Sequence, residues 1–222
     1  MRIVCQFRVI LLALCSLASV AIHATAAAKS VRSLSGNIFL LGTDGRQVQL
    51  TTGGSDSMPS VSGDGKMVAF VRSGQGVPDQ VCTMDLEAPP YPPPVCIAPQ
   101  ELVGKGDVAD VSDPQLSPDR SFVYFYTQPG NLGLIIRIDL SSRRAMVIAH
   151  SVIPIAGRSF DVIQMGRYAG DLIVRKDSEK LTAGRLFLYW LVDRQGENLA
   201  IIAEKDSDAA LFIAQSGVDD IR

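Results

Sequence analysis

An all-β fold made of repeated small sheets is the fold class that this sequence predicts. Three observations point to it. Residues 59–70 recur as residues 114–125, with proline, serine, aspartate and phenylalanine in one register 55 residues apart. Apolar runs ending in aspartate recur at intervals of 41, 54 and 54 residues, at Asp44, Asp85, Asp139 and Asp193. No stretch combines a helical apolar period with helix caps. A period of about 40–55 residues with only strands in each unit is typical of a β-propeller.

Three complete blades account for most of the predicted strands. They run from about residue 58 to 98, 112 to 149 and 160 to 203. Each contains strand-like runs rich in β-branched and aromatic residues, such as MVAFVR, FVYFYT, GLIIRI and FLYWLV. Asp-Gly pairs between these runs tolerate the positive φ of tight hairpin turns. We therefore expect three full four-stranded blades.

The two ends of the chain supply a fourth, partial blade. Two strands, at 37–41 and 46–51, precede the first full blade and would be the third and fourth strands of the partial blade. One strand, at about 210–214, follows the last blade and takes a first position. Pairing these strands would close the ring and leave fewer open edges. The alternative is an open arc whose ends a second copy covers, so self-association stays open.

Residues 1–28 have the layout of a secretory signal peptide. Arg2 and Arg8 precede an uncharged apolar run at 9–22, and small residues follow it. That run is shorter than the roughly 20 residues that span a bilayer, so we expect cleavage rather than a retained anchor, and no stable membrane insertion. Residues 29–222 then form a single propeller-like domain in an exported protein.

Composition and missing motifs exclude several function classes. The chain has 21 Lys and Arg against 23 Asp and Glu, a net charge of −2, which is not the footprint of a nucleic-acid binder. His23 lies in the signal segment, which leaves His150, and one histidine cannot build a multi-histidine metal site. Neither G-x-S-x-G nor a phosphate-binding glycine loop occurs. We expect no enzyme activity, no cofactor, no metal and no nucleic-acid partner.

The segment GNIFLLGTDGRQVQLTTGGSDSMPSVSGDGKMVAFVRS resembles the repeat of TolB-like β-propeller proteins of the periplasm, and the resemblance is clearest over residues 37–140. The matching positions of the two copies are Asp44, Gly45, Asp56, Pro59, Ser62, Asp64, Gly65, Phe70, Asp113, Pro114, Ser117, Asp119 and Phe125. The chain departs from the pattern at Val61 and Leu116, where the repeat has tryptophan. It also departs at Gly63, where the repeat has proline, and at Arg120, where it has glycine.

The resemblance implies a propeller fold and a periplasmic location. Because the sequence has no catalytic motif, we expect, by analogy with other propellers, a non-catalytic binding or scaffolding role in the cell envelope. Its partner would be an envelope protein or a small ligand, bound through the loops that join the first to the second and the third to the fourth strands of each blade. Two other interpretations remain open. In the first, the chain is the accessory propeller subunit of a prolyl-oligopeptidase-type peptidase. In the second, it is a degenerate TolB-like fragment.

We interpret the aspartates of the repeat as structural. Short acids in tight turns accept hydrogen bonds from the backbone two residues on. A calcium site needs a cluster of oxygen ligands at loop spacing, which the acid pairs of this chain do not supply.

Cys82 and Cys96 remain after signal cleavage, on runs that we interpret as the third and fourth strands of the first blade. Facing cysteines on antiparallel neighbours lie within bonding reach, so we expect a disulfide, with two buried thiols as the alternative. No C-x-x-C motif is present, so the sequence gives no indication of a redox role. The proline-rich loop between the cysteines is either a stiff exposed insertion or a recognition segment anchored by Tyr91.

Overall fold

The computed structural model describes residues 29–42, 44–103, 108–131, 133–154, 159–177 and 187–203. These residues form antiparallel strands and one short helix, α1 (Gln100–Val103). No helix among them has the length and apolar character needed to cross a membrane. The predicted signal segment 1–28 and the predicted strand 210–214 lie outside the described residues.

The strands fall into consecutive groups that follow the predicted blades. The N-terminal sheet contains β1 (Ser30–Leu34), β2 (Asn37–Leu41) and β3 (Gln47–Gln49). Blade one contains β4 (Asp56–Val61), β5 (Met67–Gly74), β6 (Val77–Asp85) and β7 (Val95–Ile97). Blade two contains β8 (Ser112–Leu116), β9 (Phe122–Thr127), β10 (Gly133–Asp139) and β11 (Ala145–Val152). Blade three contains β12 (Phe160–Val162), β13 (Leu172–Asp177), β14 (Phe187–Val192) and β15 (Asn198–Ala203).

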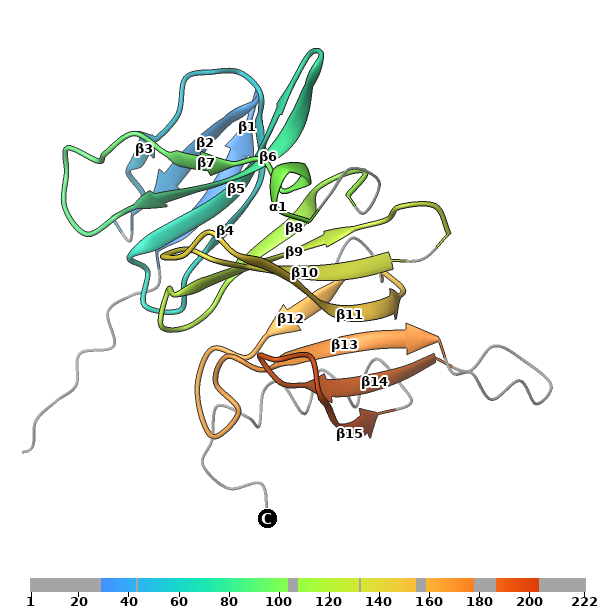
Figure 1. Ribbon diagram of the computed structural model, residues 1–222. Helices are drawn as coiled ribbons and strands as arrows, with labels where there is room; N and C mark the ends of the chain where they lie inside the picture. Colours follow the sequence, from blue (N-terminus) through green and yellow to red (C-terminus); the bar gives the residue numbers. More distant parts are fainter. Residues whose placement is uncertain are drawn as a thin grey trace, which may run out of the picture.

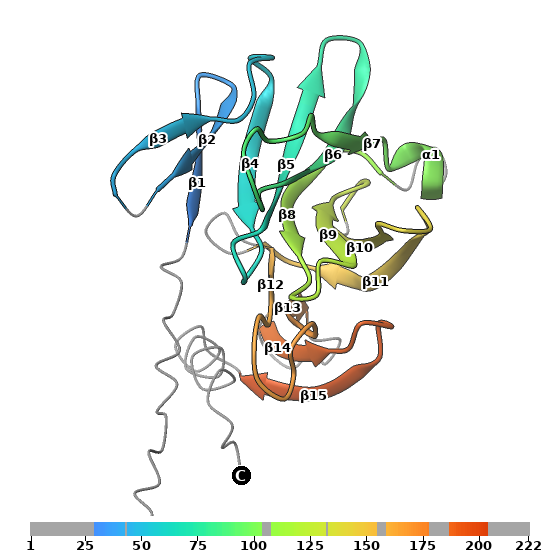
Figure 2. The same ribbon diagram turned by 90° about the vertical axis from the view of Figure 1, so that its left-hand side faces the viewer.

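These groups follow one another along an arc, each turned relative to the one before it (Figures 1 and 2). The first strand of each group lies on the inside of the arc. There β1 packs beside β4, β4 beside β8, and β8 beside β12. Each blade therefore presents one face to the blade before it and the other to the blade after it, the arrangement of a β-propeller.

Apolar side chains fill the spaces between successive groups. Ile38 and Leu40 of the N-terminal sheet meet Phe70 and Cys82 of blade one. Ala69 and Val71, the neighbours of Phe70 along β5, face blade two instead. Because successive side chains of a strand point to opposite faces, one strand can serve two cores. The third of these cores joins blades two and three around Tyr124 and Phe160.

Both inner strands β4 and β8 carry a bulge at the same place. The bulges lie between Ser57 and Ser60 and between Ser112 and Gln115, and the residues with positive φ in them are Met58 and Asp113. A proline follows each, Pro59 or Pro114, in keeping with the preference of proline for bulges. The two copies of the 55-residue repeat therefore share the bulge as well as the sequence pattern.

Three local features differ from the sequence expectation. The N-terminal pair of strands gains a third, β1, whose residues are mostly exposed, so few apolar positions mark it in the sequence. The expected strand 46–51 is shorter, as β3. Blades two and three are connected through one residue pair, Val152 with Lys176, into a single eight-stranded sheet.

Candidate functional site

The turn between β4 and β5 is held by the serine and aspartate of the repeat. The Ser62 hydroxyl donates to Asp64 Oδ1 at 2.6 Å, and the same oxygen accepts the Lys66 N–H at 3.0 Å. Ser62 Oγ also accepts the Met67 N–H at 3.0 Å. The acid and the hydroxyl thus satisfy backbone donors of their own turn.

The turn between β8 and β9 repeats these contacts. Ser117 donates to Asp119 Oδ1 at 2.6 Å, Asp119 Oδ1 accepts the Ser121 N–H at 3.2 Å, and Ser117 Oγ accepts the Phe122 N–H at 3.0 Å. One feature differs. Gly65 has φ +70° in the first turn, and Arg120 takes this place in the second with φ +59°. A left-handed conformation costs a non-glycine residue roughly 1–2 kcal/mol.

Arg120 bridges blade two to blade one. Its Nε lies 3.3 Å from Asp64 Oδ2, and its Nη1 lies 3.1 Å from Glu87 Oε1. Lys66 Nζ lies 3.7 Å from the same Glu87 oxygen. Arg120, in its left-handed conformation, therefore places its guanidinium beside Asp64 and Glu87 of the preceding blade.

Arg194 makes the corresponding bridge from blade three to blade two. Its Nη1 donates to Asp119 Oδ2 at 3.0 Å, and its Nη2 donates to the Ala169 carbonyl at 2.7 Å. Arg137 in turn donates to the Arg194 carbonyl and stacks over the Phe122 ring. We call the set Asp64, Lys66, Glu87, Asp119, Arg120 and Arg194 the charged rim.

The charged rim sets the pKa of its acids. Partial burial raises the pKa of Asp64, but the Ser62 hydroxyl, the Lys66 amide and the Arg120 guanidinium outweigh it, and the pKa falls below its usual value. Burial also raises the pKa of Asp119, but the hydrogen bonds from the Ser117 and Ser121 hydroxyls outweigh it, so this pKa falls well below its usual value. Both carboxylates are ionised at neutral pH.

Side-chain amides connect the inner strands near the rim. Gln115 of β8 donates to the Phe160 carbonyl at 2.7 Å and accepts the Val162 N–H at 3.1 Å, so it pairs with β12 as a strand would. Gln164 accepts the Gly63 N–H at 3.1 Å and donates to the Leu116 carbonyl at 3.1 Å. One side chain of blade three thereby reaches both preceding blades.

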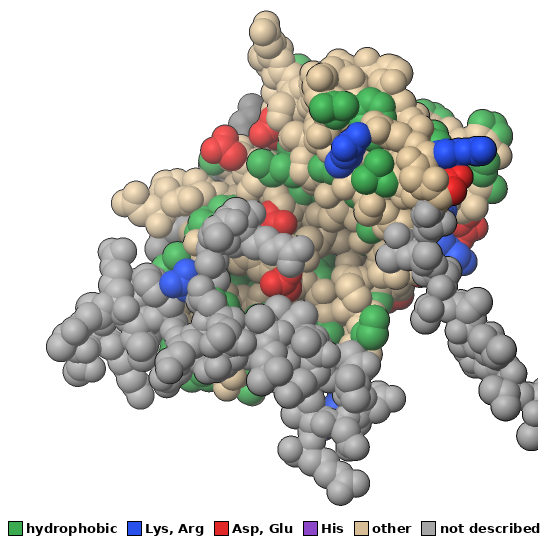
Figure 3. Space-filling model, turned by 180° about the vertical axis from the view of Figure 1, so that it is seen from behind, with side chains coloured by type: hydrophobic (Ala, Val, Ile, Leu, Met, Phe, Trp, Pro, Cys, Tyr) green, Lys and Arg blue, Asp and Glu red, His purple; other side chains and the backbone are tan. Residues whose placement is uncertain are grey.

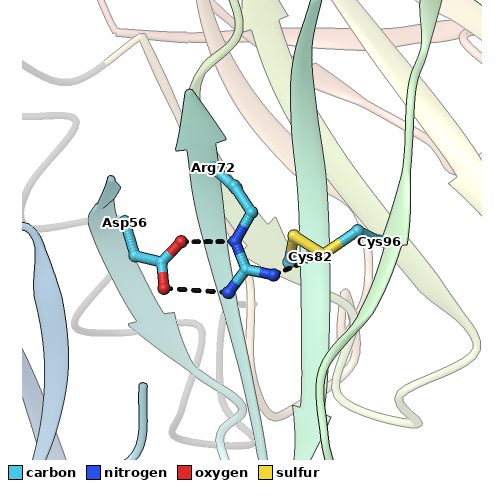
Figure 4. The surroundings of a disulfide bond; sticks show 4 residues. All are labelled: Asp56, Arg72, Cys82 and Cys96. Carbon is cyan, nitrogen blue, oxygen red and sulfur yellow. Dashed lines mark hydrogen bonds and ion pairs between the residues drawn. A yellow bond between two sulfur atoms is a disulfide. The ribbon is translucent and has the colours of Figure 1, made fainter. Parts of the chain in front are cut away.

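The Cys82–Cys96 disulfide joins directly opposed residues of β6 and β7, with the two Cα atoms 4.0 Å apart. Beside it, Asp56 is fully buried. The Arg72 Nε donates to Asp56 Oδ1 at 2.7 Å and its Nη2 donates to Oδ2 at 3.0 Å. The remaining Nη1 lies 3.6 Å from Cys96 Sγ (Figure 4). The hydrogen bond to Asp56 raises the pKa of Arg72 despite its partial burial.

The remaining predicted residues lie in other turns or in the core, where Phe70 pairs with Cys82 of the disulfide. Asp44 accepts the Arg46 N–H at 3.0 Å in the β2–β3 turn, where Gly45 has φ +76°. Asp113 Oδ2 accepts the Ser159 N–H at 2.9 Å. Phe70 and Phe125 occupy equivalent, fully buried positions on β5 and β9.

Three further residues of interest in the sequence lie against a hydrophobic core or on the surface. Tyr91 of the proline-rich loop packs, half-buried, against the core between blade one and the N-terminal sheet. Trp190 packs against the core between blades two and three. His150 is exposed on β11. Among the described residues, no group of three or more His, Cys, Asp or Glu side chains is placed to hold a metal.

Sequence reasoning missed the basic partners of the repeat acids. Arg72, Arg120 and Arg194 come from three different blades, and no local pattern connects them to Asp56, Asp64 and Asp119. Arg120 alone gave a signal, because it replaces the glycine of the turn.

No family model matches the chain, and no curated protein matches its sequence. Solved structures do resemble it. TolB from Acinetobacter baumannii is 16% identical with a TM-score of 0.47, over 78% of this chain and 39% of that one. A functionally unknown protein from Desulfotomaculum acetoxidans is 12% identical with a TM-score of 0.50, over 78% of this chain and 50% of that one.

The β-propeller domain of the Trilobed protease from Pyrococcus furiosus is 14% identical, with a TM-score of 0.48 over 80% of this chain and 58% of that domain. The chain therefore spans between 39% and 58% of these three structures. At such identities the resemblance concerns the fold alone.

Proposed function

We propose that this is an exported, non-catalytic β-propeller-like protein of the periplasm that binds an envelope protein or a small ligand at the charged rim. The observation that carries the proposal is the convergence of turns from three blades at one rim. Their acids already serve the turns and the arginines of the next blade, so the rim is a fixed charged surface. Fixed surfaces on rigid scaffolds are where binding residues concentrate.

Apolar side chains offer a partner little on the face that Figure 3 shows. On the face in Figure 3, hydrophobic side chains of the described part form small separate groups between polar and charged ones. Large apolar patches mark many protein interfaces. The rim instead offers cations and anions side by side, with Lys66 and Glu87 each half exposed. It therefore suits a polar partner with charges of both signs.

Export is supported by the disulfide. A cross-strand disulfide persists in an oxidising compartment and is rare in the reducing cytosol. The apolar segment at the N-terminus is the route that we propose for export.

A photo-cross-linking pair tests the rim. We would place a photoreactive residue at Gln195, which is exposed in the β14–β15 turn beside Arg194, or at Gln75, which is exposed in the β5–β6 turn at the opposite end of the strands. Both are exposed glutamines, so they form a matched pair. We expect a discrete cross-linked species from Gln195 in exporting cells and none from Gln75. Equal yields, or a product from Gln75 alone, would contradict the proposal.

A further inference from the structure

We propose that the Cys82–Cys96 disulfide is a reversible redox site that exchanges with a dithiol, and that Cys96, held by Arg72, is the sulfur through which exchange runs. This inference is independent of rim binding. It rests on three features of blade one: the unequal access to the two sulfurs, the orientation of one guanidinium, and the position of β7 at the sheet edge.

Access differs between the two half-cystines. Cys82 is fully buried on β6, which has a neighbouring strand on each side. Cys96 is half-buried on β7, the edge strand of blade one. An incoming thiolate must approach a sulfur directly, so the attack falls on Cys96.

Arg72 is oriented to serve Cys96. Asp56 occupies its Nε and Nη2, which leaves Nη1 free to face Cys96 Sγ at 3.6 Å. The two carboxylate contacts fix the plane of the guanidinium, so the third nitrogen cannot swing away (Figure 4). From β6, uncharged Val81 and Thr83 flank Cys82, and Tyr91 of the β6–β7 loop packs against the same core. Among the described residues, the charged groups that we place beside the sulfurs are therefore Arg72 of β5 and its partner Asp56 of β4.

The exchange balances as follows. A thiolate of the dithiol attacks Cys96 Sγ, the Cys82–Cys96 bond breaks, and Cys82 leaves with the electron pair and takes up a proton. The second thiol of the reductant then attacks the mixed disulfide. Cys96 leaves as a thiolate beside Arg72, the dithiol becomes a disulfide, and two electrons have passed to blade one. A cation next to a leaving thiolate favours this second step.

Reduction would act on the junction between blade one and the N-terminal sheet. Cys82 belongs to the core that joins them, with Ile38 and Leu40 on the other side. Opening the bond frees the short edge strand β7 and its proline-rich loop from this core. Blade two has Ile136 and Val147 at the equivalent positions, so reduction acts on blade one directly.

The test uses the purified full chain, with dithiothreitol to reduce it and glutathione as a probe. We would reduce the protein, remove the reductant without air, and follow iodoacetamide labelling of each cysteine against pH by peptide mass spectrometry. The labelling midpoint of Cys96 should lie at least about one pH unit below the ordinary thiol value of about 8.5, a tenfold gain in thiolate at neutral pH.

Two variants separate the role of Arg72 from folding. Asp56→Asn removes the carboxylate that orients the guanidinium, but it also removes the anion that opposes a thiolate and it keeps the Arg72 cation, so the midpoint of Cys96 should stay below about 8.5. The double variant Asp56→Asn/Arg72→Met removes both charges together and should return the midpoint to about 8.5. A midpoint of Cys96 that is ordinary in the unaltered protein, or that the double variant leaves low, would overturn the proposal.

Glutathione provides a readout that needs no variant. Incubating the oxidised protein with reduced glutathione should trap a mixed disulfide on Cys96. Glutathione found on Cys82, or a disulfide that dithiothreitol reduces only after the protein unfolds, would show that the bond is purely structural and would also overturn the proposal.

Discussion

Blades one and two are two copies of one repeat, but different contacts stabilise their interiors. In blade one, the residue pairs next to Phe70 are the Cys82–Cys96 disulfide and the Asp56–Arg72 ion pair. In blade two, the residue that pairs with Phe125 on β10 is Ile136, and Val147 lies opposite it on β11. The positions 55 residues beyond Asp56 and Arg72 are Val111 and Thr127, both buried.

The difference follows from what each blade packs against. Blade two lies between two blades and shares apolar cores with both. Blade one has blade two on one side but only the three-stranded N-terminal sheet on the other, where β1 and β3 are mostly exposed. A smaller partner buries less apolar surface and stabilises less. The covalent and ionic contacts lie on this weaker side.

Breaking the buried ion pair should have the largest effect. Arg72→Met leaves the carboxylate of Asp56, which has no exposed surface, without its cation. Removing one partner of a buried pair typically costs about 3–5 kcal/mol. Urea denaturation of the purified protein measures the loss.

The matched control for that variant copies blade two. Asp56→Val/Arg72→Thr installs the residues of Val111 and Thr127 and leaves no unpaired charge, so we expect a cost below about 1.5 kcal/mol. If the double variant were as unstable as Arg72→Met, the two blades would not be interchangeable at this position.

Removing the disulfide should come next. The bond joins residues 14 positions apart. In the chain-entropy model a loop of this size contributes about 3 kcal/mol. Cys82→Ile/Cys96→Val introduces the apolar pair of blade two, and should recover part of that loss relative to Cys82→Ser/Cys96→Ser. Thermal melting of the two variants side by side provides the comparison, and equal melting temperatures would contradict it.

Acid should weaken the charged rim by a smaller amount. Asp64 and Asp119 have lowered pKa values in the folded chain, so the unfolded chain binds protons first as pH falls. Their contribution is complete above the unfolded value of about 4 and is lost progressively below it. Because the side chains are 35% and 47% exposed, we expect a loss of no more than about 1 kcal/mol.

The control for this pH dependence is Asp64→Asn/Asp119→Asn. Stability of this variant should fall less steeply than that of the unaltered protein between pH 4 and pH 2. Parallel curves would mean that other groups dominate the acid response.

Arg120→Gly should have the smallest effect, because two contributions oppose each other. Glycine relieves the left-handed strain of roughly 1–2 kcal/mol. Against this, the loss of the contacts to Asp64 and Glu87 costs up to about 1 kcal/mol, and the greater freedom of glycine in the unfolded chain costs roughly 0.5–1 kcal/mol. We expect a change within about 1 kcal/mol of zero and a weaker salt dependence. A loss above 2 kcal/mol would mean that the rim contributes more than exposed ion pairs do.

Local chemistry made much of this fold predictable. The strand order of the three blades, the Asp-Gly turns and the opposition of Cys82 and Cys96 follow from alternation, turn residues and spacing, all short-range signals. β1 was not predictable, because Ser30–Leu34 has little apolar character and gains its place from β2 and β4.

The site was less predictable than the fold. The acids were visible in the repeat, but their basic partners lie 16 to 75 positions away. They are brought close by strand pairing within blade one or by packing of successive blades. The sequence likewise contains no sign that Arg72 would face Cys96. Such contacts depend on tertiary packing, which periodicity does not encode.

Intact mass spectrometry of the protein from exporting cells, with and without thiol alkylation, tests the exported, disulfide-closed state most directly. Our account predicts the mass of residues 29–222 less two hydrogens, and a gain of two alkyl groups only after reduction. A chain that retains residues 1–28, or one whose Cys82 and Cys96 alkylate without reduction, would contradict it.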